Sequence, residues 1–407
     1  MARSLIRNSN FALLWAGHLI SHAGDAVYAI ALPWLMLEHT GSKTQTALVS
    51  MSAYLPALIF GLLAGSIVDQ YNRKWIMIFS DIIRAALVII VPIFLIYGFV
   101  SPFLIGVITL SLSAFSTFFY PARDSLIPQI TTAEELPAAN SAISVSGQMS
   151  HLLGPLFAGV GISLLGLTHL FTADAISFLF SVVMISLVKA PPQIPHPHHK
   201  VSQWEGIKNG LSFVHEQRGL RRLLFLTFVN NIFIMGPAII GLPVFVKEVL
   251  TDDFTVLAQL EAAMAGGMIV GSIIFWKAIK KWNPVHILLF GIVLDGITYS
   301  FLYWVESSPT GILVLLIHGI GIPLITVSRT TIIQRSVPDH FRGRLFSMVY
   351  MAVMGTTALS VGLTGVILEY ITANGLFLII GLGAAGTVFI GLHREILTEL
   401  MEKSVHP

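Results

Sequence analysis

Long apolar runs separated by short polar connectors occupy almost the whole chain. Each run has 20 residues or more, and a helix of that length crosses a bilayer at ~1.5 Å per residue. The pattern predicts an all-α polytopic membrane protein with twelve transmembrane helices. The predicted spans are about 11–37, 46–69, 75–98, 102–122, 138–165, 168–188, 222–247, 255–276, 285–304, 309–334, 345–371 and 374–393.

The longest polar connector, residues 189–221, divides the chain into two six-span halves, 1–188 and 222–407. It begins with a stretch rich in proline and histidine, which favours an extended spacer over a helix. After this stretch, apolar residues recur at helical spacing, at Trp204, Ile207, Leu211 and Val214. We therefore expect a short amphipathic helix on the cytoplasmic surface of the membrane.

A short repeat relates the two halves. The sequence ARDSLI at 122–127 recurs 206 residues later as SRTTII at 328–333, in each case where the fourth span of a half ends. Together with six spans on each side of the connector, the repeat predicts two pseudo-symmetric six-helix bundles. Duplicated units of this kind are typical of secondary transporters.

Composition supports a membrane location and narrows the function. Charged residues make up 11% of the chain and the mean hydropathy is +0.81, whereas charged residues make up about 25% of soluble proteins. A net charge of +2 is too small to indicate a nucleic-acid partner. The chain has no cysteine, no phosphate-binding glycine loop and no recognisable nucleophile with its base, so we expect no cofactor, no metal site and no enzymatic activity.

The distribution of lysine and arginine predicts the orientation. Basic connectors at 73–74, 189–222, 277–281 and 335–344 fall on the same side as the N-terminus if twelve spans are counted, and only Lys43 and Lys247 fall on the other side. Because basic loops remain in the cytoplasm, we expect both termini to be cytoplasmic in a protein of the cell's inner (cytoplasmic) membrane.

Asp25 lies near the centre of the first span, where a carboxylate costs roughly 2.5 to 3.5 kcal/mol to insert. His18 and His22 precede it by seven and three residues, so the three titratable groups share one helical face. This pattern indicates a proton-coupling site at Asp25 and His22, with His18 as a polar lining residue. The alternative is an acid that is hydrogen-bonded to a neighbouring helix for packing alone.

Other charges in the spans have less definite roles. Asp81 and Arg84 share a face of the third span and are expected to neutralise each other. Glu261 and Asp295 occupy the eighth and ninth spans, and the pattern assigns them no function.

The loop after the second span carries a recognisable signature. Residues 65–74 read GSIVDQYNRK, which resembles the signature loop of the major facilitator superfamily. Gly61, Gly65 and Asp69 are spaced by four residues, so Gly65 permits close helix contact on the face that carries Asp69. The resemblance implies that Asp69 and Arg73 form a latch at the cytoplasmic gate. Gln70 and Asn72 depart from the pattern, so Asp124 is a candidate to complete the latch. The loop could alternatively serve only to set topology.

Further motifs are similar to one branch of that superfamily. Gly24-Asp25, the sequences PAR at 121–123, WEGIKNGL at 204–211 and RGRLFS at 342–347 resemble the macrolide-efflux and enterobactin-exporter branch of drug:proton antiporters. Gly154-Pro155, followed by Gly159, resembles a motif of the superfamily's antiporters, and the resemblance implies a hinge between outward-facing and inward-facing states.

The resemblance also implies a central cavity walled by the first, fourth, seventh and tenth spans, with His18, Tyr120, Asn230, Asn231 and His318 as candidate substrate-cavity residues. We therefore expect a monomeric secondary exporter of an amphipathic small molecule, drug-like or siderophore-like, working by proton antiport and alternating access. Its partners would be the small-molecule substrate, protons and membrane lipids. A lysophospholipid flippase, a divalent-metal exporter using Asp25 and His22, and a non-transporting sensor remain alternatives.

Overall fold

The computed structural model describes residues 8–190, 212, 214–337 and 339–392, and every regular element in these ranges is a helix. The chain forms two compact units, Met1–His198 and His199–Pro407. The boundary between them falls inside the connector at 189–221. Most of the amphipathic helix expected there, including Trp204, Ile207 and Leu211, lies outside the described residues.

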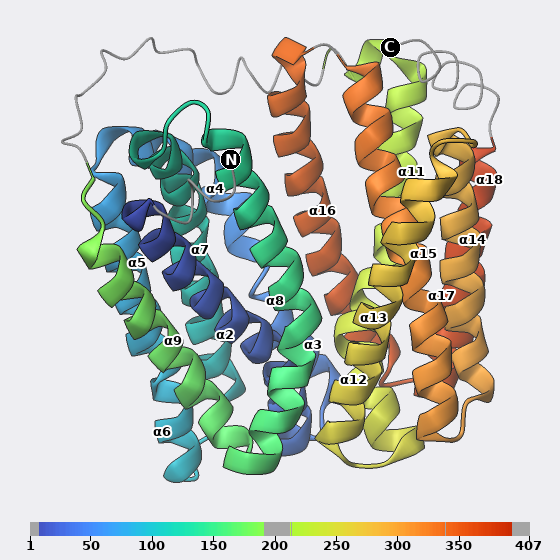
Figure 1. Ribbon diagram of the computed structural model, residues 1–407. Coiled ribbons are helices and arrows are strands. Elements are labelled where there is room, and N and C mark those ends of the chain that lie inside the picture. The colour runs from blue at the N-terminus through green and yellow to red at the C-terminus, as the bar shows by residue number, and fades with distance from the viewer. Residues whose placement is uncertain (1–7, 191–211, 213, 338, 393–407) are drawn as a thin grey trace. The chain divides into compact units, whose positions relative to one another are not determined.

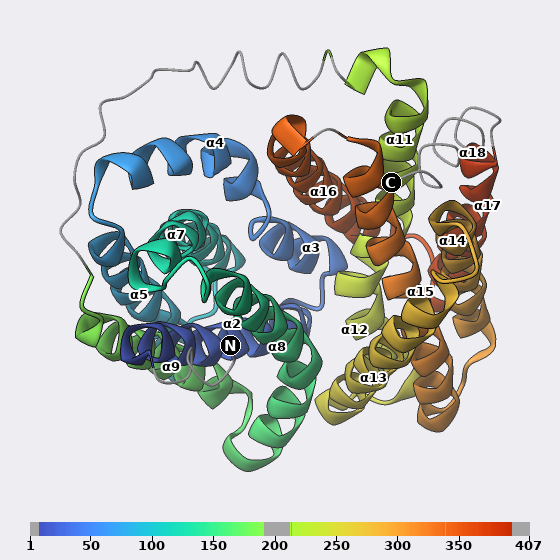
Figure 2. The same cartoon turned by 45° about the horizontal axis from the view of Figure 1, so that its top comes forward.

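The N-terminal unit is a bundle in which sequence neighbours are often not spatial neighbours (Figures 1 and 2). Side by side, the long helices follow the order α4, α7, α5, α9, α2, α8. The elements are α2 (Ser9–Thr40), α3 (Lys43–Met51), α4 (Leu55–Gln70), α5 (Arg73–Val88), α6 (Ile90–Ile96), α7 (Pro102–Ile130), α8 (Leu136–Leu165) and α9 (Leu167–Leu187).

Local capping fixes where α2 begins and ends. The Asn8 side chain accepts a hydrogen bond from the Phe11 amide at 3.2 Å, which satisfies one of the free N–H groups of the first turn. Gly41 follows the last turn with φ +62°, a conformation that glycine adopts without strain, and its N–H donates to Leu37 O at 3.0 Å. These caps hold a single helix of 32 residues with Asp25 near its middle.

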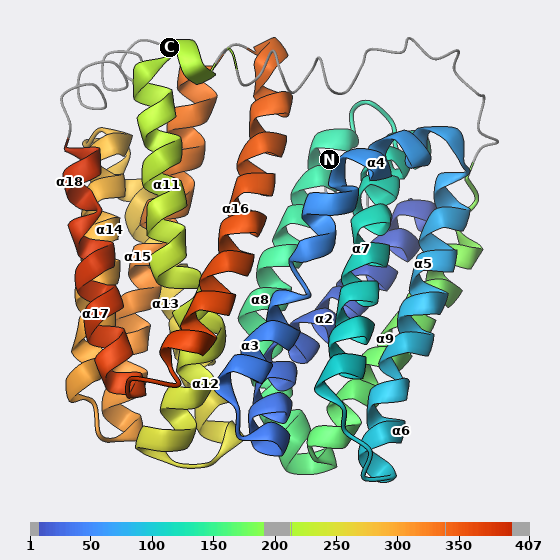
Figure 3. The same ribbon diagram turned by 180° about the vertical axis from the view of Figure 1, so that it is seen from behind.

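The C-terminal unit repeats the arrangement (Figure 3), with the order α13, α15, α14, α17, α11, α16. Its seventh predicted span is interrupted by two π-helical turns, η1 and η2, which begin at Pro237 and Val246. The elements are α11 (Arg218–Gly236), η1 (Pro237–Gly241), α12 (Leu242–Phe245), η2 (Val246–Leu250), α13 (Phe254–Ala278), α14 (Pro284–Phe301), η3 (Leu302–Trp304), α15 (Ser308–Ser336), α16 (Asp339–Ile367), α17 (Ala373–Gly386) and α18 (Val388–Gly391).

The two units correspond helix by helix. Helices α7 and α15 each have 29 residues, and the repeated hexapeptides begin 20 residues after the first residue of each helix. Equivalent positions are equally buried: Ala122 and Ser328 are both 0% exposed, and Ile127 and Ile333 are both 1% exposed. The shared neighbour order and the shared register support a duplicated six-helix unit.

Ten helices in the described part of the chain are long and apolar enough to cross a membrane. The predicted span at 138–165 is also a single helix, α8. The span at 46–69 is divided into α3 and α4, with Pro56 in the first turn of α4. Proline has no N–H to continue the helical hydrogen bonds from the residues before it.

Candidate functional site

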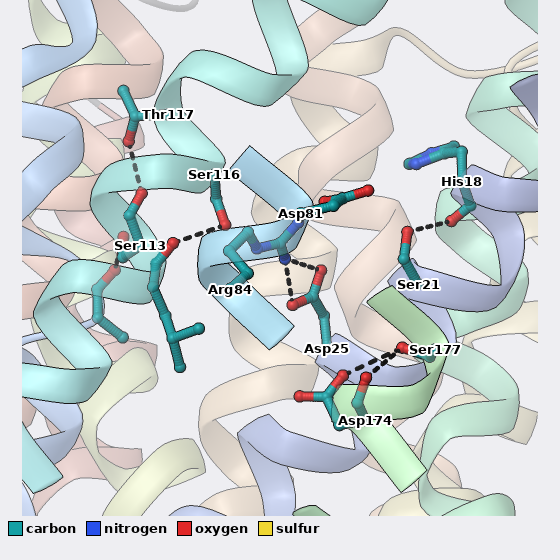
Figure 4. Close-up of polar contacts among 12 residues, drawn as sticks. His18, Ser21, Asp25, Asp81, Arg84, Ser113, Ser116, Thr117, Asp174 and Ser177 are labelled. Carbon is teal, nitrogen blue, oxygen red and sulfur yellow. Dashed lines mark hydrogen bonds and ion pairs between the residues drawn. The ribbon is translucent and has the colours of Figure 1, made fainter. Parts of the chain in front are cut away.

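Asp25 is held by a guanidinium from another helix. Arg84 Nη2 on α5 donates to both carboxylate oxygens of Asp25 on α2, at 2.5 Å to Oδ1 and 2.7 Å to Oδ2 (Figure 4). The Arg84 side chain is 2% exposed and that of Asp25 is 30% exposed. Asp25 is thus the accessible end of a buried ion pair, and charge-assisted bonds of this kind are the strong ones.

The same guanidinium binds a second carboxylate. Arg84 Nη1 donates to Asp81 Oδ1 at 3.1 Å, and Asp81 is fully buried. The expected pairing of Asp81 with Arg84 is therefore present, but Arg84 is shared with Asp25. The Phe178 ring lies 4.0 Å from the guanidinium carbon, which adds a cation–π contact.

A third acid, Asp174 on α9, lies in the same region (Figure 4). It is 1% exposed, and its Oδ1 accepts from Ser177 Oγ at 3.3 Å. A side chain at position 24 would collide with Asp174 Oδ1 and Ser177 Oγ. Gly24 therefore allows α9 to approach α2 one residue before Asp25, which gives the Gly24-Asp25 pair a packing reason.

The charges of this cluster do not balance. Asp25, Asp81 and Asp174 supply three carboxylates, and Arg84 supplies one positive charge. Like charges in a buried cluster repel one another more strongly than they do in water, because the effective dielectric constant is lower. The cluster is therefore suited to hold protons, because protonating a carboxyl removes charge that the single guanidinium does not compensate.

The two histidines of the first span lie beside an aromatic and basic group on α7. His18 Nε2 lies 2.9 Å from Arg123 Nη1 on α7. Since a guanidinium only donates, Nε2 accepts and the ring proton of the neutral imidazole lies on Nδ1. His22 lies 5.3 Å from His18 and 6.3 Å from Tyr120 between ring centroids. The structure thus gathers three predicted site residues around Arg123.

The predicted gate residues lie at the junction of α4 and α5. Gly65 and Asp69 belong to α4, although the placement of their side chains is not described. Arg73 is the first residue of α5, and its neighbour Lys74 donates to Ser186 O at 2.7 Å and Val188 O at 2.8 Å at the end of α9. Asp124, the remaining predicted gate residue, accepts two hydrogen bonds at Oδ1 from Arg123, from Nε at 2.8 Å and from Nη2 at 2.7 Å.

The predicted hinge lies beside the charge cluster. Helix α8 continues through Gly154, Pro155 and Gly159. A side chain at position 154 would reach within 2.6 Å of Ala26 Cβ. Gly154 therefore lets α8 pack against α2 at Ala26, the residue after Asp25. The contact of Gly24 with α9 lies at the residue before Asp25.

The C-terminal candidates for the substrate cavity bind other parts of their own unit. Asn231 Nδ2 donates to Thr356 Oγ1 at 2.7 Å and Thr357 Oγ1 at 3.1 Å, which joins α11 to α16. Asn230 Nδ2 lies 3.5 Å from Thr387 Oγ1. His318 is fully buried and lies 3.3 Å from a carboxylate oxygen of Asp295. A role of these residues in substrate binding stays a prediction.

Sequence reasoning found the acids but missed how they are joined. The Asp81–Arg84 spacing of three residues is visible in the sequence, whereas the 59 residues between Asp25 and Arg84 give no local signal. Asp174 likewise gives no local signal of its proximity to Asp25, which lies 149 residues earlier. The signal that could have linked it is Gly24, whose missing side chain marks a close helix contact.

Comparison with known proteins decides the family. The model of a protein family described as "transmembrane secretion effector" matches residues 2–405, nearly the whole chain. The chain belongs to this family of major facilitator superfamily transporters. The superfamily predicted from the loop at 65–74 is thereby confirmed, and membership makes this transmembrane secretion effector a transporter and not an enzyme.

Its curated relatives are named as efflux proteins. The chain is 26% identical over 367 residues to the multidrug efflux pump Tap of Mycolicibacterium fortuitum, covering 88% of this chain and 86% of the relative. It is 22% identical over 378 residues to macrolide efflux protein A of Streptococcus pyogenes, covering 91% and 92%. The predicted efflux branch agrees with these relatives.

Solved structures show the same fold. The nucleoside transporter NupG has a TM-score of 0.76 at 13% identity, covering 94% of this chain and 99% of that one. A bacterial homologue of the iron transporter ferroportin has a TM-score of 0.73 at 14% identity, covering 96% and 100%. At this identity the likeness establishes the fold alone.

Proposed function

We propose that this secretion effector exports an amphipathic, drug-like small molecule in exchange for protons, by alternating access. The observation that carries the proposal is the cluster in which Asp25, Asp81 and Asp174 lie near a single guanidinium, that of Arg84. The efflux names of its relatives supply the substrate class. An excess of buried acid is what a carrier needs in order to bind and release protons inside the membrane.

Proton binding at Asp25 changes how α2 is held to α5. With Asp25 ionised, Arg84 Nη2 makes two short bonds to it. Hydrogen bonds to charged groups contribute about 1.5 to 3 kcal/mol each. A proton on Asp25 weakens both bonds, and Arg84 keeps its bond to Asp81. The strength of the α2–α5 connection thus depends on one proton.

The packing around Asp25 directs the effect of that proton. The close contacts at Gly24 and Gly154 hold α2 against α9 and α8. Tightly packed helices of this kind move together. In the proposed cycle, protonation therefore changes the position of α5 relative to the group formed by α2, α8 and α9, and this change contributes to switching access.

The group around Arg123 is the proposed contact for substrate in the N-terminal unit. His18, His22 and Tyr120 present flat polarisable rings, and the Arg123 guanidinium lies 5.1 Å from the Tyr120 ring centroid. Aromatic surfaces with a few polar atoms suit amphipathic molecules of varied shape. Asp69 and Arg73 remain the proposed cytoplasmic gate, with both termini in the cytoplasm and the chain acting as a monomer in the inner membrane.

The contacts of Asp25 favour proton antiport over divalent-metal export. Its two oxygens are both occupied by Arg84. Within the described residues, no group of three or more histidine and acidic side chains is placed to hold a metal ion. A metal would therefore have to displace Arg84 Nη2 from both oxygens before binding.

The test is transport in proteoliposomes loaded with the macrolide erythromycin, with and without an imposed pH gradient. The wild-type protein should move the macrolide faster under the gradient. Asp25→Asn should lose at least about tenfold of the gradient-driven rate, since it cannot ionise, whereas Asp252→Asn, an exposed acid paired with Lys247, should retain it. Proton-driven transport by Asp25→Asn would contradict the proposal, and transport that ignores pH would favour the flippase.

A further inference from the structure

A second buried acid lies in the C-terminal unit, far along the chain from Asp25. Asp295 on α14 is 1% exposed and His318 on α15 is 0% exposed. Asp295 Oδ1 lies 3.3 Å from His318 Nε2, and neither carboxylate oxygen receives a hydrogen bond from the described residues. Among those residues Asp295 also forms no ion pair with lysine or arginine. A buried carboxylate in this setting carries a large desolvation penalty.

Thr298 is a second polar neighbour of the His318 ring. Its hydroxyl oxygen lies 2.8 Å from Leu294 O, 2.9 Å from Asp295 O and 3.0 Å from His318 Nδ1. A threonine hydroxyl within a helix commonly donates its single proton to a backbone carbonyl, so we assign the ring proton of neutral His318 to Nδ1, from which the hydroxyl oxygen accepts. With this assignment, Nε2 has no proton.

This arrangement places two lone pairs face to face. His318 Nε2 and Asp295 Oδ1 are both acceptors at 3.3 Å when the ring is neutral and the acid is ionised. One additional proton between them replaces the repulsion by a hydrogen bond, whether it resides on the carboxyl or on the imidazole. The pair is therefore incomplete without that proton.

The surroundings leave little else to neutralise the acid. Tyr299 of α14 stacks on the His318 ring with centroids 3.9 Å apart. Glu261 of α13 interacts electrostatically with Tyr299, so it adds negative charge when ionised. Helix α17, which packs on the other side of α14, has no titratable side chain. These groups favour a bound proton and offer no competing cation.

Close helix packing excludes water from the pair. A side chain at Gly321 would meet Asp295 N at 3.4 Å, and one at Gly296 would collide with the backbone of Gly381 and Ala385. We infer that the Asp295–His318 pair is a proton-binding site of the C-terminal unit, separate from the Asp25 cluster. Asp295 lies on α14, the helix of the C-terminal unit that corresponds to α5. Helix α14 packs against α15 and α17, as α5 packs against α7 and α9.

The site is tested without substrate or gradient, so the result is independent of the proposed transport cycle. The full chain in lipid nanodiscs, labelled at the aspartate carboxyl carbon and the histidine ring, is titrated between about pH 5 and about pH 9 by infrared difference spectroscopy. The expected result is a protonated-carboxyl or imidazolium band that is lost in Asp295→Asn and in His318→Gln. Glu261→Gln and Asp25→Asn should both retain it.

Thr298→Val separates proton binding from a merely structural role. Without the Thr298 acceptor, the ring can place its proton on Nε2 and satisfy Asp295 without an additional proton. The midpoint of the titration should then fall by about one pH unit, a tenfold weaker proton affinity. Folding of each variant is checked by its unfolding temperature. An unchanged band in Asp295→Asn, or an unshifted midpoint in Thr298→Val, overturns the inference.

Discussion

Replacing Arg84 by methionine should destabilise the N-terminal unit severely. The change removes the one positive charge that serves Asp25 and Asp81, while methionine keeps much of the side-chain volume against Phe178. Breaking a buried pair by removing one partner typically costs 3 to 5 kcal/mol. Because Asp25 is 30% exposed, solvent screens part of the loss. We expect a decrease of about 3 kcal/mol in the free energy of unfolding.

The measurement is equilibrium unfolding in mixed micelles, followed by the fluorescence of the seven tryptophans. Lys247→Met is the matched control, since it also removes a lysine or arginine from an ion pair, but its partner Asp252 is 61% exposed. Exposed pairs contribute about 0 to 1 kcal/mol. The difference between the two variants therefore isolates burial from charge removal.

A double variant sharpens this prediction. Asp25→Asn added to Arg84→Met removes one uncompensated carboxylate, so the double variant should be more stable than the sum of the two single effects. Acidification should also reduce the damage in Arg84→Met, because protonation removes the remaining unpaired charge. If Arg84→Met costs no more than Lys247→Met at neutral pH, the cluster does not hold the helices as described.

Three further predictions concern packing and orientation. Gly24→Ala should lower the free energy of unfolding by roughly 1 to 3 kcal/mol, since the new methyl group collides with α9. In Gly61→Ala the methyl group meets no atom within 4 Å, so this control should be neutral or stabilising. A comparison of the two unfolding midpoints tests the prediction. Asn231→Leu should lower the free energy of unfolding by about 1 to 3 kcal/mol, because Asn231 is bound to α16, and should have little effect on macrolide affinity. A loss of macrolide affinity at wild-type stability would instead support the predicted role of Asn231 in the substrate cavity. Since the chain has no cysteine, a single cysteine introduced as Arg73→Cys or Lys43→Cys reports the orientation of its loop. In intact cells an impermeant maleimide should label position 43 and not position 73. The reverse labelling pattern would contradict the predicted topology.

The sequence was sufficient for the fold class because hydrophobic length is a strong local signal. Ten of the predicted spans were recognised as apolar helices in the described residues. The second span consists of two helices, α3 and α4, since Pro56 has no N–H to continue a helix across their junction in spite of the apolar composition. The π-helical turns at Pro237 and Val246 could not be predicted, because hydrogen-bond register within an apolar run leaves no compositional trace.

The candidate site was predictable only in its parts. A carboxylate in a membrane helix is conspicuous in any sequence, so Asp25 was found. Its partner was not, because the contact with Arg84 depends on the rotation of α2 and α5 about their axes. The same limit separated Asn230 and Asn231 from their partners on α17 and α16. Helix rotation is set by many weak packing contacts spread over the bundle.

The single guanidinium among three acids also determines how the N-terminal unit responds to membrane voltage. With no proton bound, the cluster carries two net negative charges, and with two protons it is neutral. Moving one elementary charge across 100 mV changes the free energy by about 2.3 kcal/mol. In the proposed cycle, the number of protons held around Arg84 therefore decides whether the carrier is driven by electrical potential or by the pH difference alone.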